Sequence, residues 1–225
     1  MNIFFDLDGT IIDSRRGIYK AYYESIVNIK KPKSEDLFIK NIGPPIDQIL
    51  PILHEDLSLK DLKKVVSDFR SIYDNHYYLD FDLYDQMDNV LSDLSKSYDC
   101  FILTNKPIKP TLDILKKLDI KKYFKDSIGV NTYNNLGQSK YLNIRMLLKK
   151  KSLKNSQTIY IGDTYSDYKS AISNNIIFIG YTDGFYNWNF DELNEINYYY
   201  KNVLKLKNKL NEVISLNPKL LSSKF

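Results

Sequence analysis

The chain has 225 residues, of which 43% are hydrophobic and 27% are charged, and its formal net charge is +4 at pH 7. This composition is typical of a folded globular protein with one good core and room for a smaller second lobe, and it excludes global disorder. The charge is modest and spread along the sequence, and no nucleic-acid-binding module is recognisable, so nucleic acid is not an expected partner.

The sequence lacks the usual signals for export or membrane insertion. No stretch approaches the roughly 20 apolar residues of a membrane span, and the first residues lack the charged-then-apolar pattern of a secretory signal. The single cysteine, Cys100, has no partner for an internal disulfide and precedes an apolar run. We therefore expect a cytoplasmic protein without a membrane partner, in which Cys100 is a small buried hydrophobic residue.

The chain begins with a short apolar run, residues 3–5, that ends on two carboxylates and a glycine. This pattern predicts a buried strand that delivers acids to the edge of a sheet. Because residues two apart on a strand project to the same side, Asp6 and Asp8 can face one site. Their repulsion would be relieved by Mg²⁺, which prefers oxygen ligands and commonly binds phosphate. Gly9 permits a sharp turn and Thr10 offers a hydroxyl, although an ordinary Asp-Gly turn after an edge strand explains the same residues.

Residues 15 to about 80 are expected to be entirely helical. Apolar residues recur at helical spacing over residues 15–29, 46–53 and 59–78. Ser14 and Ser34 are the expected N-caps of the first two helices, and the Gly-Pro-Pro run at 43–45 breaks the pattern. The segment is therefore an all-helical insertion after the first strand.

From residue 83 the pattern alternates between helix and strand. Helices are expected over residues 84–94, 110–118, 139–150 and 167–173. Strands are expected over residues 99–103, 127–130, 158–162 and 176–179. An edge strand near residues 198–200 and a last helix before residue 216 complete the series, with a frayed end. Such alternation implies right-handed crossovers and a mostly parallel sheet covered on both faces, so the predicted fold class is α/β.

Polar residues follow several of these strands. Ligands of parallel sheets bind beyond the carboxyl ends of the strands, where Asp6, Thr104 and Asp163 would all fall. Taken alone, Thr104 and the next residue, Asn105, are typical of a simple turn. Asp163 and Asp167, four residues apart at a helix entrance, could each be an ordinary helix N-cap.

In combination, these motifs resemble the haloacid dehalogenase superfamily, whose members are mostly phosphatases. Asp6-x-Asp8-Gly9-Thr10 resembles its first motif and Thr104 its second. The resemblance implies a Rossmann-like core in which Asp6 is the nucleophile that forms an aspartyl-phosphate and Asp8 is the general acid and base. It also implies that the phosphate is bound by Thr104, Asn105 and Gly9.

The fourth motif of that family is Gly-Asp-x-x-x-Asp, and Gly162-Asp163-x-x-x-Asp167 resembles it. The resemblance implies that Asp163 completes a Mg²⁺ site with Asp6 and the backbone carbonyl of Asp8. Asp167 would ligate the ion directly or orient a water bound to it.

The third motif of the family is a lysine or arginine that holds the nucleophile and the phosphate. Lys140, preceded by the Gly-Gln-Ser loop at 137–139, has this place, although Tyr141 follows it where relatives commonly have proline. The alternatives are Lys106, Lys149 and Lys150. The proline that follows Lys106 predicts that this lysine begins a surface turn.

The helical insertion resembles the small helical (C1-type) cap of the family. It predicts a catalytic core of residues 1–14 and 82–225 and a cap domain of residues 15–81. Residues 41–45 and the Thr-Asn-Lys-Pro run at 104–107 resemble the branch that contains phosphoglycolate phosphatase and beta-phosphoglucomutase. The cap residues expected to contact substrate are Lys40, Asn41 and Gly43.

The resemblance implies a Mg²⁺-dependent phosphatase that acts on a small phosphomonoester, such as phosphoglycolate, a sugar phosphate or a nucleotide, as a monomer or weak dimer. The presence of Asp8 argues against a dehalogenase, which protonates no alkoxide. Two alternatives stay open: a mutase like beta-phosphoglucomutase, and a non-catalytic binding module.

Overall fold

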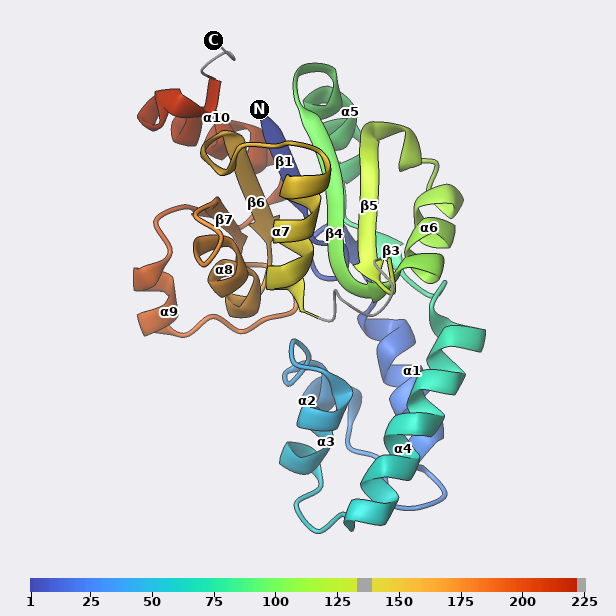
Figure 1. The fold of residues 1–225 in the computed structure, drawn as a ribbon. Coiled ribbons are helices and arrows are strands. Elements are labelled where there is room, and N and C mark those ends of the chain that lie inside the picture. Colours follow the sequence, from blue (N-terminus) through green and yellow to red (C-terminus); the bar gives the residue numbers. More distant parts are fainter. Residues whose placement is uncertain (133–138, 222–225) are drawn as a thin grey trace. The chain divides into compact units, whose positions relative to one another are not determined.

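The structure, a computed structural model, describes residues 1–132 and 139–221 (Figure 1). Within it the chain forms two compact units. The first comprises Met1–Ile12, Leu83–Gly184 and Trp188–Phe225, and the second comprises Asp13–Asp82 and Phe185–Asn187. None of the helices in the described part of the chain combines the length and the apolar character needed to cross a membrane.

The first unit is built on a six-stranded sheet of order β5-β4-β1-β6-β7-β8. The strands are β1 (Asn2–Phe5), β4 (Asp99–Pro107), β5 (Phe124–Val130), β6 (Thr158–Gly162), β7 (Ile177–Tyr181) and β8 (Tyr199–Tyr200). Every neighbouring pair is parallel. The predicted α/β class with a mostly parallel sheet is therefore confirmed.

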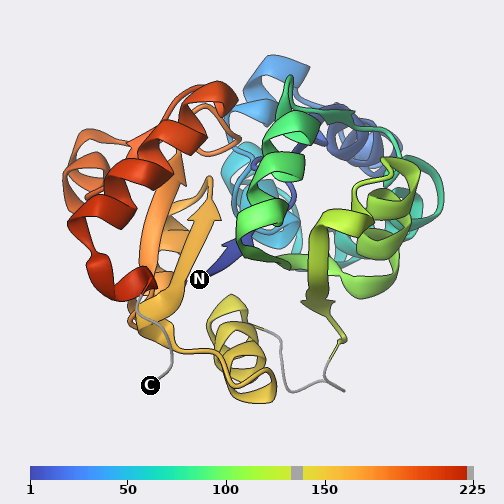
Figure 2. The ribbon, with the colours of Figure 1, turned by 90° about the horizontal axis from the view of Figure 1, so that it is seen from above.

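Helices cover this sheet on both faces, as Figure 2 shows for α5 and α10 on one face and α7 on the other. They are α5 (Met87–Ser97), α6 (Ile108–Lys117), α7 (Lys140–Lys150), α8 (Tyr165–Ile172), α9 (Phe190–Glu195) and α10 (Leu206–Leu216). Short helical turns add η2 (Lys121–Tyr123), η3 (Asn155–Gln157), η4 (Val203–Lys205) and η5 (Pro218–Leu221). Helix α5 begins later than predicted because Gln86, with a φ of 62°, has a left-handed conformation.

Strand β1 lies at the centre of the sheet, between β4 and β6. Its apolar residues are fully buried because strands flank it on both sides and helices cover both faces. Phe5 is in register with Ile102 of β4 and Ile161 of β6. The three strands therefore reach the same level together, and the polar residues that come after this level in each segment emerge at one edge of the sheet.

Strand β4 runs to Pro107, beyond the predicted end at residue 103. It remains paired with β5 through an irregularity, because Leu103 pairs with Ile128 whereas Pro107 pairs with Val130. Gly129 makes this close approach possible, since a side chain there would overlap the backbone of Lys106. A bulge of this kind re-aims the side chains at the end of a strand.

The second unit is helical. Its helices are α1 (Arg15–Ile26), α2 (Glu35–Ile39), α3 (Ile46–Leu53), α4 (Leu59–Ile72) and the π-helical turn η1 (Tyr73–Tyr77). Fully buried Tyr22 and Phe38 stack in its core with ring centroids 4.1 Å apart. The chain passes between the units at β2 (Ile12–Asp13) and β3 (Asp82–Leu83), which pair with each other.

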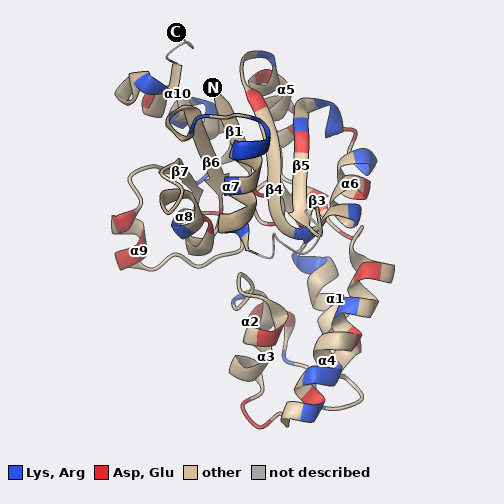
Figure 3. Ribbon diagram, viewed as in Figure 1, with Lys and Arg blue, Asp and Glu red and all other residues tan. Residues whose placement is uncertain are grey.

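The two serines predicted as N-caps in the second unit occupy the N-cap positions, but their side chains do not make the expected hydrogen bonds. Ser14 and Ser34 occupy the N-cap positions of α1 and α2, yet neither side chain makes a capping hydrogen bond. The side chain of Ser58 does so for α4, accepting from the N–H of Asp61. Figure 3 shows acidic and basic residues interspersed along α1, α4 and α6, in keeping with the modest net charge.

Candidate active site

Three carboxylates converge at the carboxyl edge of the sheet in the first unit. Asp6 follows β1, Asp163 follows β6, and Asp167 lies in the first turn of α8. One oxygen from each lies within 4.8 Å of the others, and all three residues are buried. The carboxylate of Asp8 lies outside this group. Asp6 and Asp163 directly follow strands that lie side by side in parallel register, and this register brings the three acids together.

Room for Asp163 is made by two glycines. Gly9 has a φ of 79°, and a side chain there would overlap the Asp163 carboxylate. A side chain at Gly184 would overlap the same residue. The N–H of Gly9 donates to the carbonyl of Ile12 at 2.8 Å, so Gly9 serves the site chiefly through its missing side chain. Thr10 completes the cradle, because its Oγ1 donates to Oδ1 of Asp163 at 3.2 Å.

Asp167 is fully buried and has two functions in the fold. Its Oδ2 accepts from the N–H of Thr164 at 3.0 Å and its own N–H donates to the hydroxyl of Thr164 at 3.1 Å, and these two bonds form a capping box at the start of α8. The same Oδ2 also accepts from that hydroxyl at 2.8 Å. Its Oδ1 pairs with Lys140. The N-cap is therefore Thr164 and neither of the two acids, and Asp167 supports the helix while facing the site.

Lys140 brings a cation into the cluster. It begins α7, its side chain is 5% exposed, and its Nζ lies 3.1 Å from Oδ2 of Asp6. Helix α7 is capped by Ser139, which accepts from the N–H of Leu142; Gly137 and Gln138 lie outside the described residues. Lys149 and Lys150, the alternatives in the sequence, are exposed at the far end of the same helix.

The electrostatics of the cluster favour a further cation. Burial raises the pKa of Asp6 to about 6; Lys140 opposes this rise, and the charges of Asp167 and Asp8 add to it. For Lys140, burial alone would lower the pKa, but Asp167 and Asp6 outweigh it and hold the pKa above its ordinary value. The cluster thus contains three carboxylates, of which two pair with one ammonium.

One oxygen of this cluster is also short of a partner. Oδ1 of Asp6 is buried, and no hydrogen-bond donor lies within reach of it among the described residues. Buried carboxylate oxygens are costly unless they are hydrogen-bonded or coordinate a metal. Excess negative charge, all-oxygen donors and this unpaired atom together fit a hard divalent cation such as Mg²⁺.

A second lysine reaches the site from β4. Nζ of Lys106 donates to Oδ1 of Asp8 at 3.0 Å, and the side chain of Lys106 is 5% exposed. The expectation that Lys106 begins a surface turn is wrong, because β4 continues through Pro107 and alternation along the strand turns Lys106 inward. The proline that follows favours a turn locally, but the pairing of β4 with β5 outweighs that preference.

The two residues that precede Lys106 differ in exposure. Thr104 is buried, and its Oγ1 accepts from the N–H of Lys106 at 3.2 Å. Since a hydroxyl donates one hydrogen and accepts others, that bond uses an acceptor site and leaves the donor for a ligand. The side chain of Asn105 is exposed.

Tyr160 is a residue of the site that sequence reasoning missed. It is fully buried on β6, donates from its hydroxyl to the carbonyl of Leu103 at 2.9 Å, and lies 3.5 Å from Oδ1 of Asp167. Nζ of Lys140 lies 5.8 Å from the centre of its ring. In the sequence it is one aromatic residue within an apolar strand, and no local signal distinguishes it.

The predicted cap residues lie in the second unit. The carbonyl of Lys40 accepts from Nδ2 of Asn187 at 2.9 Å, and the side chain of Asn41 donates to the carbonyl of Leu37 at 2.8 Å. Gly43 has a φ of 146°, and a Cβ there would lie 3.1 Å from the ring of Tyr186. The chain around Lys40 and Gly43 is thus held by residues from the 185–187 segment of the same unit.

Comparison with known proteins gives consistent results. The family model described as haloacid dehalogenase-like hydrolase matches residues 3–181. A phosphoglycolate phosphatase from Vibrio parahaemolyticus is 26% identical over 200 residues, covering 81% of this chain and 84% of that protein.

Two further similar proteins match different shares of this chain. A phosphorylated carbohydrates phosphatase from Thermotoga maritima is 28% identical over 127 residues, 54% of this chain and 57% of that protein, so the match spans little more than half of the relative's length. The solved structure of a haloacid dehalogenase-like hydrolase from Streptococcus pneumoniae superposes with a TM-score of 0.83 at 29% identity, covering 93% of this chain and 97% of that one.

Proposed function

The chain belongs to the haloacid dehalogenase-like hydrolase family, and on that premise we propose that it is a Mg²⁺-dependent phosphatase of small phosphomonoesters. The observation that carries the proposal is the buried group of Asp6, Asp163 and Asp167, two of which pair with Lys140, with one oxygen of Asp6 unpaired among the described residues. The names of the Vibrio and Thermotoga relatives support the phosphatase class and the small, phosphorylated substrate.

The carboxylates of Asp6, Asp163 and Asp167, with the backbone carbonyl of Asp8, would hold the metal ion. Its contribution when bound is positive charge beside the phosphoryl oxygens, which offsets the charge of substrate and carboxylates. Two features make these residues suitable for Mg²⁺: all the donor atoms are oxygens, and carboxylates outnumber ammonium groups in the cluster.

The first chemical step is attack by an oxygen of Asp6 on phosphorus. A bond forms between that oxygen and phosphorus while the bond from phosphorus to the leaving oxygen breaks, which gives an aspartyl-phosphate. Lys140, 3.1 Å from Asp6, orients the nucleophile and balances charge on the transferring group. The hydroxyl of Thr104 donates to a phosphoryl oxygen, aided by the backbone at Asn105 and by the tight turn at Gly9.

Asp8 moves the protons. It gives a proton to the leaving oxygen in the first step, and then takes one from the water that attacks the aspartyl-phosphate. The second step breaks the bond between phosphorus and Asp6, which releases phosphate and restores the carboxylate. The helical second unit acts as the cap, and Lys40, Asn41 and Gly43 contribute to substrate choice.

The direct test is hydrolysis of p-nitrophenyl phosphate with and without Mg²⁺. Activity that requires Mg²⁺ and falls by roughly three orders of magnitude or more in Asp6→Asn is expected. Comparable turnover by Asp6→Asn would show that the nucleophile is assigned wrongly.

The substrate is found by screening phosphoglycolate, sugar phosphates and nucleoside monophosphates for released phosphate. Isomerised sugar phosphate in place of free phosphate would indicate a mutase. Binding of Mg²⁺ without turnover of any phosphomonoester would indicate a binding module.

A further inference from the structure

The ion pair between Lys106 and Asp8 joins residues that are 98 positions apart in the sequence. The ammonium is almost fully buried, whereas the Asp8 side chain is 22% exposed. A buried ammonium is costly unless a partner compensates it, and Asp8 is that partner. Lys106 is therefore held at the edge of the site, against the residue to which the proposed function assigns both proton transfers.

The backbone of Lys106 is fixed on both sides. Before it, the hydroxyl of Thr104 accepts from its N–H at 3.2 Å. After it, Pro107 is in register with Val130 of β5, and Gly129 lets the strands approach at the bulge. A side chain that starts from such a restrained backbone holds its terminal group more accurately than one on a mobile loop.

The two buried lysines of the site contact different carboxylates. Lys140 pairs with Asp6 and Asp167, and Lys106 pairs with Asp8. Each lysine reaches the site from a different element, α7 for Lys140 and β4 for Lys106. The two ammonium groups therefore restrain different carboxylates, and the loss of one is not made good by the other.

We propose that Lys106 is a positioning residue for proton transfer: by donating to Oδ1 of Asp8 it fixes the direction in which that carboxylate meets the leaving oxygen. This inference rests on the proposed phosphatase function. Loss of Lys106 should therefore affect substrates unequally, because a misdirected general acid slows the departure of poor leaving groups more than that of good ones.

The test uses Lys106→Met with two aryl phosphates of similar shape, phenyl phosphate and p-nitrophenyl phosphate. Phenolate is the poorer leaving group, so its departure depends more on the proton from Asp8. The ratio kcat/KM reports all steps up to and including departure. We expect Lys106→Met to lower kcat/KM on phenyl phosphate by about 10- to 100-fold, and on p-nitrophenyl phosphate by much less.

A double-mutant cycle shows whether Lys106 acts through Asp8. In the Asp8→Ala background, Lys106→Met should change kcat/KM on phenyl phosphate by less than about twofold, since the group that it positions is gone. An equal loss in both backgrounds, or an equal loss on both substrates, would overturn the inference and indicate that Lys106 contacts substrate itself. Lys106→Arg should recover part of the loss.

Two controls complete the test. Lys109→Met, at an exposed lysine of α6, should leave both kcat/KM values unchanged. The melting temperature of Lys106→Met, with and without Mg²⁺, shows that the variant is folded and still binds the metal. Wild-type protein that hydrolyses neither ester would refute the proposed function and this inference together; active wild type with an unchanged substrate ratio in Lys106→Met would refute the inference alone.

Discussion

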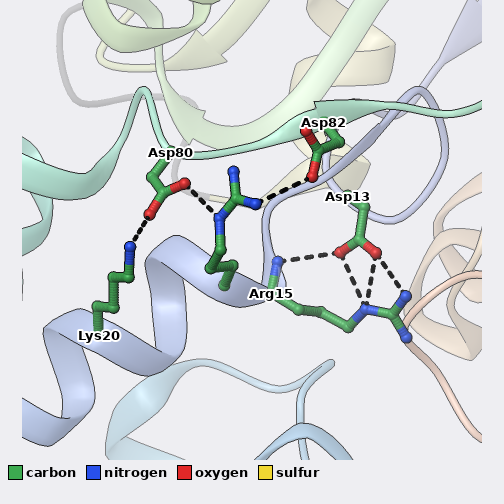
Figure 4. A network of polar contacts seen from close by, with 6 residues as sticks. Asp13, Arg15, Lys20, Asp80 and Asp82 are labelled. Carbon is green, nitrogen blue, oxygen red and sulfur yellow. Dashed lines mark hydrogen bonds and ion pairs between the residues drawn. The ribbon is translucent and has the colours of Figure 1, made fainter.

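The two units each contain a group of charged residues, and the two groups are built on opposite principles. In the first unit, three buried carboxylates cluster together and Lys140 pairs with two of them. In the second, the network in Figure 4 joins carboxylates and cations in equal number, largely at the surface. Its members are Asp13, Asp80, Asp82, Arg15, Arg16 and Lys20.

The effect on the pKa of the acids differs accordingly. The pKa of Asp6 is raised to about 6, chiefly by burial. For Asp80, burial alone would raise the pKa, but hydrogen bonds from Lys20 and Arg16 outweigh it and lower the pKa below its ordinary value. An unbalanced buried cluster opposes folding until it binds a ligand, whereas a balanced exposed one supports folding modestly. The following predictions test that contrast.

The largest effect is expected for Lys140→Met in metal-free protein. Removal of the only ammonium that contacts Asp6 and Asp167 in the described structure leaves these carboxylates uncompensated. We expect a loss of roughly 3 to 5 kcal/mol in the free energy of unfolding, measured by urea denaturation in EDTA. Lys149→Met, at an exposed position of the same helix, is the matched control and should change it by less than about 0.5 kcal/mol. Similar values for the two variants would contradict the contrast.

Asp6→Asn should stabilise the metal-free protein at neutral pH. The pKa of Asp6 rises from 3.8 to about 6 on folding, so its ionised form weakens the fold. The penalty is complete above pH 6, fades as the pH falls from 6 towards 3.8, and is absent below that. The gain should be about 3 kcal/mol at pH 8, from the shift in pKa, and should vanish near pH 3. Denaturation curves across this range measure it, and a gain that persists in acid would contradict it.

Mg²⁺ should stabilise the wild-type protein by about 3 kcal/mol at a hundredfold excess over its Kd, because it binds the folded state alone. Asp163→Asn should lose most of this gain, since Asp163 is one of the three clustered carboxylates. Asp80→Asn, in the second unit, should keep it. Thermal melts with and without MgCl₂ make the comparison, and equal responses in both variants would place the metal elsewhere.

The smallest effect is expected for Asp80→Asn on stability. Asp80 bonds Lys20 at 2.7 Å and Arg16 at 2.5 Å, but both cations are about half exposed. We expect a loss of at most about 1 kcal/mol at pH 7. Because the pKa of Asp80 is lowered on folding, its contribution is present above its ordinary value of 3.8 and is lost as the pH falls through the folded value. A loss that grows in acid would have the wrong sign.

Much of the architecture was predictable because local patterns determine it. The predicted strand at residues 158–162 is β6 with the same bounds, and the α/β class and the haloacid dehalogenase family are both confirmed. Apolar runs that end on Asp6 and Asp163 coincide with the ends of β1 and β6, whereas the run that ends on Thr104 lies within β4, which continues to Pro107. These signals depend only on neighbouring residues, so they can be recognised in the sequence without knowledge of the fold.

Contacts between distant segments were harder to predict. The proline beside Lys106 predicts a surface position, and only the continued pairing of β4 with β5 turns this lysine towards Asp8. Tyr160 was one aromatic residue among others until the fold placed its hydroxyl between Leu103 and Asp167. No local pattern distinguishes Tyr160, whereas Lys106 lies in a Thr-Asn-Lys-Pro run whose proline favours a turn.

By itself, the sequence determined which segments are strands, which acids terminate them and which family they match, because periodicity, turn residues and motif spacing act over a few neighbours. Tertiary structure alone decided which lysine meets which carboxylate, how deeply each charge is buried and which oxygen of Asp6 finds no hydrogen-bond partner in the described part of the chain. The reason is physical: burial and charge pairing depend on atoms brought together from positions far apart in the chain, and their strength changes steeply with distance and solvent access.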